Sequence, residues 1–263
     1  MKALVLSAGY GERLRPLTDT IPKPLLEVGG RPLIHYPLML LQAAGITDVA
    51  INIHHLGEQI EDTLGDGRAL GLSITYSPEA VLMGTGGPLL ALRDYFADAP
   101  FVILNCDTII DLDLARMAEF HRAHDGLATL ALRDGGDPDA YSRIEIDTAG
   151  QIRRMRLLKP RTRGDFNDYP SNLSPAVGKS LKPYMYCGVM ICAPDVLSNM
   201  PRTAPFGLVA DLLVPRFATG ARLFGFTHDG FFRTVDDGAG YDALRDEFSH
   251  GVPPVAAPGM IKD

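Results

Sequence analysis

The sequence has few cysteines, no surplus of positive charge and no long hydrophobic run. The three cysteines, Cys106, Cys187 and Cys192, stand singly in apolar stretches and lack the spacing of zinc ligands. A small, odd number of cysteines in such surroundings is typical of reduced core thiols in a cytoplasmic protein. The formal net charge of −7 argues against a nucleic-acid-binding surface.

No apolar segment approaches the length that crosses a bilayer, and the first residues lack the architecture of a signal peptide. No internal repeat is present. Hydrophobic residues make up 46% of the 263 residues, which indicates a globular protein large enough for one domain with a substantial core. We therefore expect a cytoplasmic protein with neither a membrane nor a nucleic acid as its partner.

The first half of the chain alternates short apolar runs with segments of helical periodicity. We expect strands at 2–6, 48–53, 73–76, 101–104 and 128–132, and helices at 32–44, 56–64, 89–96 and 112–124. This alternation predicts an α/β fold with a doubly wound, mostly parallel, Rossmann-like sheet. Ligands of such sheets bind at the carboxyl ends of the strands.

The pattern changes after residue 140. We expect a hairpin from 143–147 and 152–157, strands at 184–191 and 222–226, and a helix at 205–217. The polar segment 159–183 is interrupted by prolines and predicts a long loop that is either mobile or a lid. We treat residues 1–248 as one domain and 249–263 as a tail.

The first predicted strand ends in a glycine-rich segment that carries cations. The segment reads Leu6-Ser7-Ala8-Gly9-Tyr10-Gly11-Glu12-Arg13-Leu14-Arg15-Pro16-Leu17-Thr18. Its small residues leave backbone N–H groups accessible, and with Lys23 nearby it predicts a phosphate site. It is neither a P-loop, since GxxxxGK[ST] is absent, nor a dinucleotide loop, since Leu14 replaces the third glycine. A plain glycine turn with surface cations is the alternative.

Together with Pro22-Lys23-Pro24, this segment resembles the signature of the sugar-1-phosphate nucleotidyltransferases, also called nucleoside-diphosphate-sugar pyrophosphorylases. The resemblance runs from Met1 to about Tyr241 and is weak between about 160 and 183. It implies the nucleotidyltransferase fold, with residues 1–140 as a nucleotide-binding half and 141–248 as a sugar-binding half. The chain ends at 263, so we expect no C-terminal left-handed β-helix.

The resemblance implies that a sugar 1-phosphate attacks the α-phosphorus of a nucleoside triphosphate and releases pyrophosphate. The partners would be an NTP and a sugar 1-phosphate, the cofactor Mg²⁺, and the protein a monomer or homodimer. The implied catalytic residues are Arg13, which holds the β- and γ-phosphates, Lys23, which reaches the α-phosphate or the attacking phosphate, and Asp107. Asp107 and Asp236 would bind the metal, although Asp237 departs from the family pattern and an Asp-Asp-Gly surface turn is the alternative.

The remaining implied contacts concern the loop, the base and the sugar. Loop and strand-end contacts are expected at Leu6, Ala8, Gly9, Gly11 and Asn105. Glu79, Gly84, Thr85 and Gly86 resemble the base-binding segment, in which Glu79 would accept the N1 and N2 protons of guanine. The family's Glu-Lys-Pro appears here as Leu158-Lys159-Pro160, and its Asn-Ala-Gly appears as Tyr186-Cys187-Gly188. Lys159 and Gly188 match the family and are expected to contact the sugar phosphate side. Leu158 replaces the Glu that binds sugar hydroxyls in the family.

We expect guanylyl transfer to a mannose-type or manno-heptose-type 1-phosphate. One alternative is uridylyl transfer to a glucose-type or muramic-acid-type 1-phosphate. Another is a catalytically weak regulatory homologue that binds nucleotide sugars.

Overall fold

The computed structural model describes residues 1–137, 139–159, 162–170 and 181–249. The chain forms two compact units. Unit 1 contains Met1–Leu82, Phe101–Ala115 and the chain from Gly230 onward, and unit 2 contains Met83–Pro100 and Arg116–Asp229. Each unit is therefore built from segments distant in sequence.

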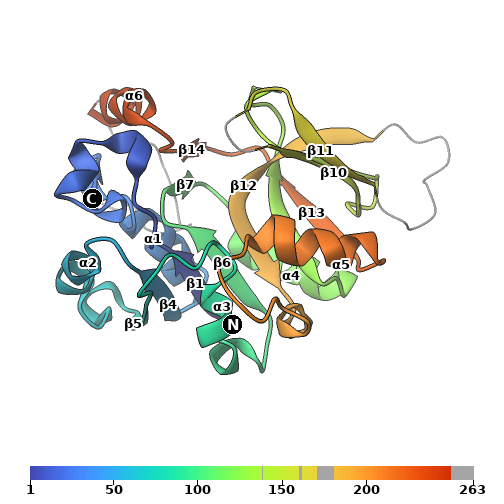
Figure 1. Cartoon of the computed structure of the whole chain (residues 1–263), viewed down its shortest axis with the longest axis horizontal. Helices are drawn as coiled ribbons and strands as arrows, with labels where there is room; N and C mark the ends of the chain where they lie inside the picture. The colour runs from blue at the N-terminus through green and yellow to red at the C-terminus, as the bar shows by residue number, and fades with distance from the viewer. Residues whose placement is uncertain (138, 160–161, 171–180, 250–263) are drawn as a thin grey trace. The chain divides into compact units, whose positions relative to one another are not determined.

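A parallel sheet forms the centre of unit 1 (Figure 1). Strand β1 (Lys2–Leu6) lies between β6 (Phe101–Asn105) and β4 (Asp48–Ile53), and β5 (Ser73–Pro78) pairs with the far side of β4. β1, β4 and β6 are almost wholly buried and apolar, as expected of a parallel sheet covered on both faces. Helices α1 (His35–Ala43) and α2 (Gly57–Leu64) belong to the same unit. The predicted strands of unit 1 and its doubly wound α/β character are confirmed.

Unit 1 also contains elements that the sequence pattern did not predict. Strands β7 (Thr108–Ile110) and β14 (Phe232–Thr234) form a small antiparallel sheet, and helix α6 (Gly238–Ser249) follows it. Tyr241, Leu244 and Phe248 of α6 join Leu14 and Val235 in one buried cluster. The end of the described chain thus packs against the segment that follows the glycine loop.

Unit 2 is mostly antiparallel. Its strands follow the order β11 (Phe166–Pro170), β10 (Ile152–Leu158), β9 (Arg143–Ile146), β12 (Lys182–Cys192) and β8 (Ala128–Arg133), and β13 (Leu223–His228) pairs parallel to β8. The predicted hairpin of β9 and β10 is confirmed. The expectation of an unbroken loop over 159–183 is wrong at β11, which pairs with β10 and is fixed there by the Arg154–Asp168 ion pair. Residues 160–161 and 171–180, where about half of the expected loop or lid falls, lie outside the described residues.

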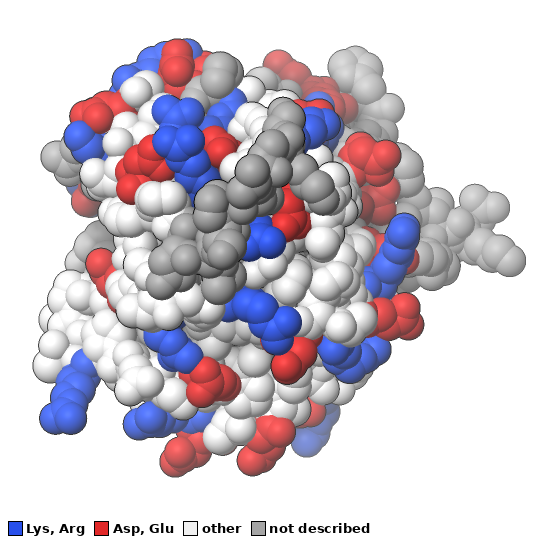
Figure 2. Space-filling view, turned by 90° about the vertical axis from the view of Figure 1, so that its right-hand side faces the viewer, with Lys and Arg blue, Asp and Glu red and all other residues white. Residues whose placement is uncertain are grey.

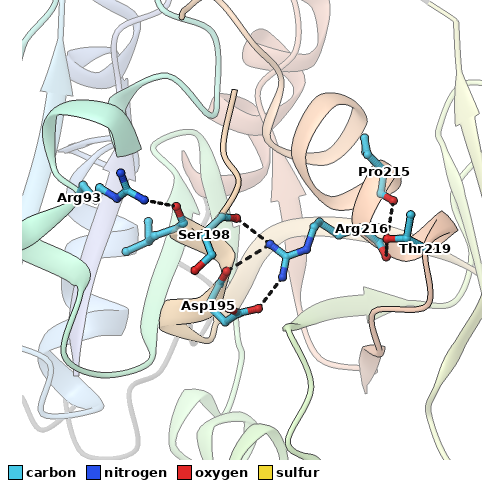
Figure 3. Close-up of polar contacts among 7 residues, drawn as sticks. Arg93, Asp195, Ser198, Pro215, Arg216 and Thr219 are labelled. Carbon is cyan, nitrogen blue, oxygen red and sulfur yellow. Dashed lines mark hydrogen bonds and ion pairs between the residues drawn. The ribbon is translucent and has the colours of Figure 1, made fainter. Parts of the chain in front are cut away.

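Helix α4 (Leu114–His124) begins in unit 1 and continues into unit 2. The other helices of unit 2 are short: α3 (Pro88–Ala91) is followed by a separate 3₁₀ turn, and a π-helix at Leu208–Leu213 runs into α5 (Val214–Ala218). Pro215 has no N–H to donate, so the regular helical ladder predicted over 205–217 is interrupted there. Arg216 of α5 donates to the carbonyls of Asp195 and Ser198 and pairs with the Asp195 carboxylate (Figure 3). This arginine fixes α5 to the turn after β12.

Charges of both signs are mixed on the face drawn in Figure 2, where the described Lys and Arg side chains lie among Asp and Glu. Within unit 2, Lys182 pairs with Asp134, Arg163 with Asp137 and Arg222 with Asp125. Among the described residues, no helix has the combination of length and apolar sequence that a membrane span requires.

Candidate functional site

The glycine loop after β1 is folded tightly against the Pro22-Lys23-Pro24 turn. Gly11 has a left-handed φ of 65°. A Cβ atom there would lie 2.8 Å from Thr18 Cγ2 and 3.3 Å from Lys23 Cβ, so only glycine fits. The Thr18 hydroxyl donates to the Gly11 carbonyl at 2.9 Å. A Cβ at Gly9 would instead meet nothing within 4 Å, so the loop is open on that side.

Lys23 and Asp107 form an ion pair with little exposure. Lys23 begins a 3₁₀ turn, Lys23–Leu25, and Asp107 lies in the link between β6 and β7. The Nζ of Lys23 contacts Oδ2 of Asp107, and the two side chains are 16% and 15% exposed. Reduced access of water makes this pairing stronger than that of a surface pair. A cation and a carboxylate are therefore held together where β6 ends.

Arg13 and Asp236 form a second pair with an N–O distance of 3.2 Å. Their side chains are 68% and 37% exposed, so the pair adds little to folding stability. The antiparallel register sets Thr108 opposite Thr234, which places Asp107 and Asp236 beyond the same end of the β7–β14 sheet. The segment 234–238, in which Asp237 departs from the family pattern, therefore brings the Asp236 carboxylate to the glycine-loop segment.

The two aspartates supply oxygen donors of the kind that Mg²⁺ prefers. Among the described residues, no group of three or more His, Cys, Asp and Glu side chains forms a metal cage. Mg²⁺ usually binds one or two carboxylates and completes its shell with water and substrate phosphates. Asp107 and Asp236 fit that donor set.

Glu79 follows β5 and is buried, with 5% exposure. Its Oε1 accepts a hydrogen bond of 2.8 Å from Nδ2 of Asn52, and its N–H donates to the Ile53 carbonyl. Unit 1 thus gathers Glu79 with the other residues predicted from strand ends and loop, which are Leu6, Ala8, Gly9, Gly11, Arg13, Lys23, Asn105, Asp107 and Asp236. Asn52 belongs to none of the sequence motifs, although an amide near the end of an apolar strand is a signal in itself.

The other predicted base contacts, Gly84, Thr85 and Gly86, belong to unit 2 and pack against the segment after residue 205. A Cβ at Gly84 would lie 2.4 Å from the Phe206 carbonyl oxygen, and one at Gly86 would lie 2.3 Å from the Phe206 ring. The Thr85 hydroxyl accepts from the Leu208 N–H at 2.9 Å. Close packing alone requires these glycines.

The predicted sugar contacts also lie in unit 2. Lys159 pairs with Asp165 at 2.8 Å. Gly188 has a φ of 73° in β12, within the stretch from Tyr186 to Met190 where the register with β8 shifts. Neither residue needs a ligand to explain its conformation.

A pocket of about 270 Å³ lies beside Leu158 and Tyr186. Most of its other lining is apolar, from Leu130, Ile144, Leu157, Tyr169, Val209 and Ala210, with polar groups from Ser142 and Asn167. The Ser142 hydroxyl oxygen accepts a hydrogen bond of 3.0 Å from the Leu158 N–H. The position where the family signature has Glu therefore opens onto an apolar surface.

All three cysteines are buried and free, as predicted. Burial raises the pKa of the Cys106 thiol to about 12, and the neighbouring Asp107 carboxylate adds to the shift. Burial likewise raises the pKa values of Cys187 and Cys192 to about 12. These thiols are neutral packing groups.

Comparison with known proteins identifies the family. A family model described as nucleotidyl transferase matches residues 2–164. The chain is 41% identical over 152 residues to mannose-1-phosphate guanyltransferase of Kluyveromyces lactis, covering 57% of this chain and 42% of that protein. It is 51% identical over 114 residues to N-acetylmuramate alpha-1-phosphate uridylyltransferase of Neisseria meningitidis serogroup B, covering 43% of this chain and 49% of that protein. These matches span less than half the length of either relative.

The fold has solved counterparts. The crystal structure of HddC from Yersinia pseudotuberculosis complexed with GMP-PN superposes with a TM-score of 0.71 at 20% identity, over 94% of this chain and 99% of that one. At that identity the likeness concerns the fold alone, and it agrees with the parallel sheet of unit 1. With the family model matching residues 2–164, the chain belongs to the nucleotidyl transferase family.

Proposed function

We propose that the protein transfers a nucleotidyl group from an NTP to a sugar 1-phosphate and releases pyrophosphate. The Lys23–Asp107 pair carries the proposal. Joining two polyanions requires fixed positive charge and a metal-binding carboxylate at one place. A scarcely exposed lysine and aspartate, held where a glycine loop and a central strand end, supply both.

Each residue of unit 1 has a proposed task. The guanidinium of Arg13 holds the β- and γ-phosphates, because its planar fork suits phosphate oxygens. Lys23 neutralises the α-phosphate or the attacking phosphate. Leu6, Ala8, Gly9, Gly11 and Asn105 form the surface against which the nucleotide lies. Asp107 and Asp236 hold Mg²⁺, which neutralises phosphate charge when bound.

For the base, we propose guanine, with Glu79 of unit 1 in contact with it. A carboxylate accepts hydrogen bonds, and guanine presents two adjacent donors, N1–H and the 2-amino group. The identity to a mannose-1-phosphate guanyltransferase supports a mannose-type acceptor, and a manno-heptose-type 1-phosphate is the related form of this proposal. Residues 1–140 would serve the nucleotide and 141–248 the sugar, in a cytoplasmic monomer or homodimer.

The apolar pocket beside Leu158 favours a second candidate. A hexose needs hydroxyl-binding groups, whereas a sugar with an acyl or ether substituent can place apolar atoms against Leu158 and Tyr186. Together with 51% identity to an N-acetylmuramate alpha-1-phosphate uridylyltransferase, this pocket supports uridylyl transfer to a muramic-acid-type 1-phosphate. Lys159 and Gly188 would lie on the same sugar side.

A pyrophosphate-release assay tests both candidates. Each of the four common NTPs is paired with mannose, glucose, N-acetylglucosamine and N-acetylmuramate 1-phosphates, with Mg²⁺ and with EDTA. We expect one base and one sugar class to dominate and EDTA to abolish release. No turnover in any pair, together with tight binding of an NDP-sugar, would instead identify a regulatory homologue.

A further inference from the structure

Asn52 is a buried amide in an otherwise apolar strand. It lies in β4, opposite Leu6 of β1 on one side and Ser77 of β5 on the other, and is 3% exposed. An amide so buried is costly unless its donor and acceptor are both used. Its partners therefore show what the position does.

Both ends of the Asn52 amide reach segments that the proposed function assigns to the nucleotide. Its Oδ1 accepts the Ser7 N–H at 2.8 Å, at the start of the glycine loop. Its Nδ2 donates to Glu79 Oε1, also at 2.8 Å. Because a backbone N–H can only donate, the atom of Asn52 that faces Ser7 must be the oxygen, which fixes the orientation of the amide. The amide nitrogen therefore faces Glu79, and Oε1 of Glu79 is the acceptor.

A second link joins the same two segments. His54 Nδ1 lies 2.7 Å from the Glu79 carbonyl oxygen, and its Nε2 lies 3.0 Å from the hydroxyl of Tyr10 in the glycine loop. A carbonyl only accepts, so Nδ1 carries a proton. The loop after β1 and the residue after β5 are thus tied across β4 at Ser7 and again at Tyr10.

We propose that Asn52 is a positioning residue that couples the glycine loop to Glu79 and thereby sets base selectivity. The inference rests on the proposed function, in which Glu79 reads the base. By donating to Oε1, Asn52 orients the Glu79 carboxylate, an acceptor group that matches the adjacent donors of guanine. Uracil presents one N–H between two carbonyls, and this edge matches a neutral amide better.

Exchange of the donor and acceptor roles tests the coupling. Asn52→Asp keeps the acceptor for Ser7 but sets a second carboxylate against Glu79, and we expect GTP affinity about 10-fold lower or worse. Asn52→Asp combined with Glu79→Gln restores a donor–acceptor pair with the roles reversed. The double variant should recover the wild-type melting temperature and the protection of the Ser7 amide, while its preference for GTP over UTP falls about 10-fold or reverses.

Binding of GTP and UTP is measured by calorimetry, and loop protection by hydrogen exchange. Thr129→Val is the matched control, since it removes a similarly buried hydrogen bond to His121 in unit 2 and should leave base preference unchanged. An unchanged GTP-to-UTP ratio in the folded double variant would overturn the coupling. Binding without turnover in wild type would overturn the proposed function but leave this test intact, and no nucleotide binding at all would overturn both.

Discussion

The two units use charge differently. In unit 1, ion pairs join residues far apart in sequence, Lys23 to Asp107 and Arg13 to Asp236, beside the glycine loop. In unit 2, Arg154 and Lys159 pair with aspartates of the next hairpin segment, and the pocket beside Leu158 is apolar. Its long-range pairs, such as Arg222–Asp125, are exposed. Long-range pairs need the whole unit to be folded, whereas hairpin pairs need only local structure. We therefore expect substitutions in unit 1 to remove catalysis and substitutions in unit 2 to change the acceptor.

The largest effect is expected at the Lys23–Asp107 pair. Lys23→Ala or Asp107→Asn should reduce kcat by about 10³-fold, because each removes a fixed charge that the transferring phosphoryl group requires. Pyrophosphate release measures the rate, and circular dichroism checks that each variant is folded.

An exposed pair in unit 2 is the control for these variants. Arg222→Ala removes the partner of Asp125, in a pair whose side chains are 49% and 97% exposed. It should leave the rate within about twofold, since exposed pairs contribute little. Wild-type rates in both Lys23→Ala and Asp107→Asn would remove the site assignment.

Unit 1 was the more predictable unit because its signals are local. An apolar run, a glycine turn and a cation between prolines are all short patterns, and parallel strands gather their carboxyl ends at one edge. Lys23 and Asp107 were each predicted as site residues, but their pairing with each other was not, because it depends on how the Pro22-Lys23-Pro24 turn packs against the end of β6. The Asn52 bridge joins three segments, and no spacing rule in a single sequence reveals it.

The parts that the sequence did not predict depend on long-range packing. Strands β7 and β14 are three residues each and have no periodicity of their own, yet their register brings Asp236 beside the glycine-loop segment. β11 lies in a polar, proline-rich stretch and forms because β10 offers it an edge. The base contacts at Gly84 and Gly86 stay a prediction, and the close packing of both glycines against Phe206 in unit 2 is a requirement that the local sequence pattern does not show.

Arg13 should show a smaller and different effect. Arg13→Ala should raise KM for the NTP about 10- to 100-fold through loss of a phosphate contact. Its melting temperature should stay at the wild-type value, because the Arg13 side chain is 68% exposed. Steady-state kinetics and thermal melting separate the two quantities, and a stability loss without a KM change would make Arg13 a structural residue.

Leu158 tests whether unit 2 selects the sugar. Leu158→Glu places a carboxylate at the pocket beside Tyr186, so the ratio of kcat/KM for an unsubstituted hexose 1-phosphate to that for N-acetylmuramate 1-phosphate should rise roughly 10-fold. Leu158→Met keeps the surface apolar and should leave that ratio unchanged. If Leu158→Glu alters both substrates equally, the pocket does not contact the sugar.

The smallest effect concerns stability and compares the cores of the two units. Burial lowers the pKa of His35 in unit 1 and of His121 in unit 2 below the ordinary 6.5, with Arg31 adding to the shift at His35. Both rings are therefore neutral in the folded protein above pH 6.5, and their contribution to stability is complete there. As the pH falls below 6.5, the unfolded chain takes up protons first, so stability decreases until the folded-state pKa values are reached.

The melting temperature should accordingly fall between pH 7.5 and pH 5.5, and His121→Gln, which cannot take up a proton, should flatten that slope. Carboxylates with lowered pKa values, such as Asp147, titrate below 3.8 and do not act in this window. Thermal melting of His121→Gln and of the wild type is followed by a separate signal from each unit, so that the pH dependence of the two units can be compared. If His121→Gln flattens only the unit 2 transition, the units unfold independently, whereas one shared transition means that protonation of either core destabilises the whole chain. A slope unchanged from wild type would show that His121 is protonated equally in the folded and unfolded states.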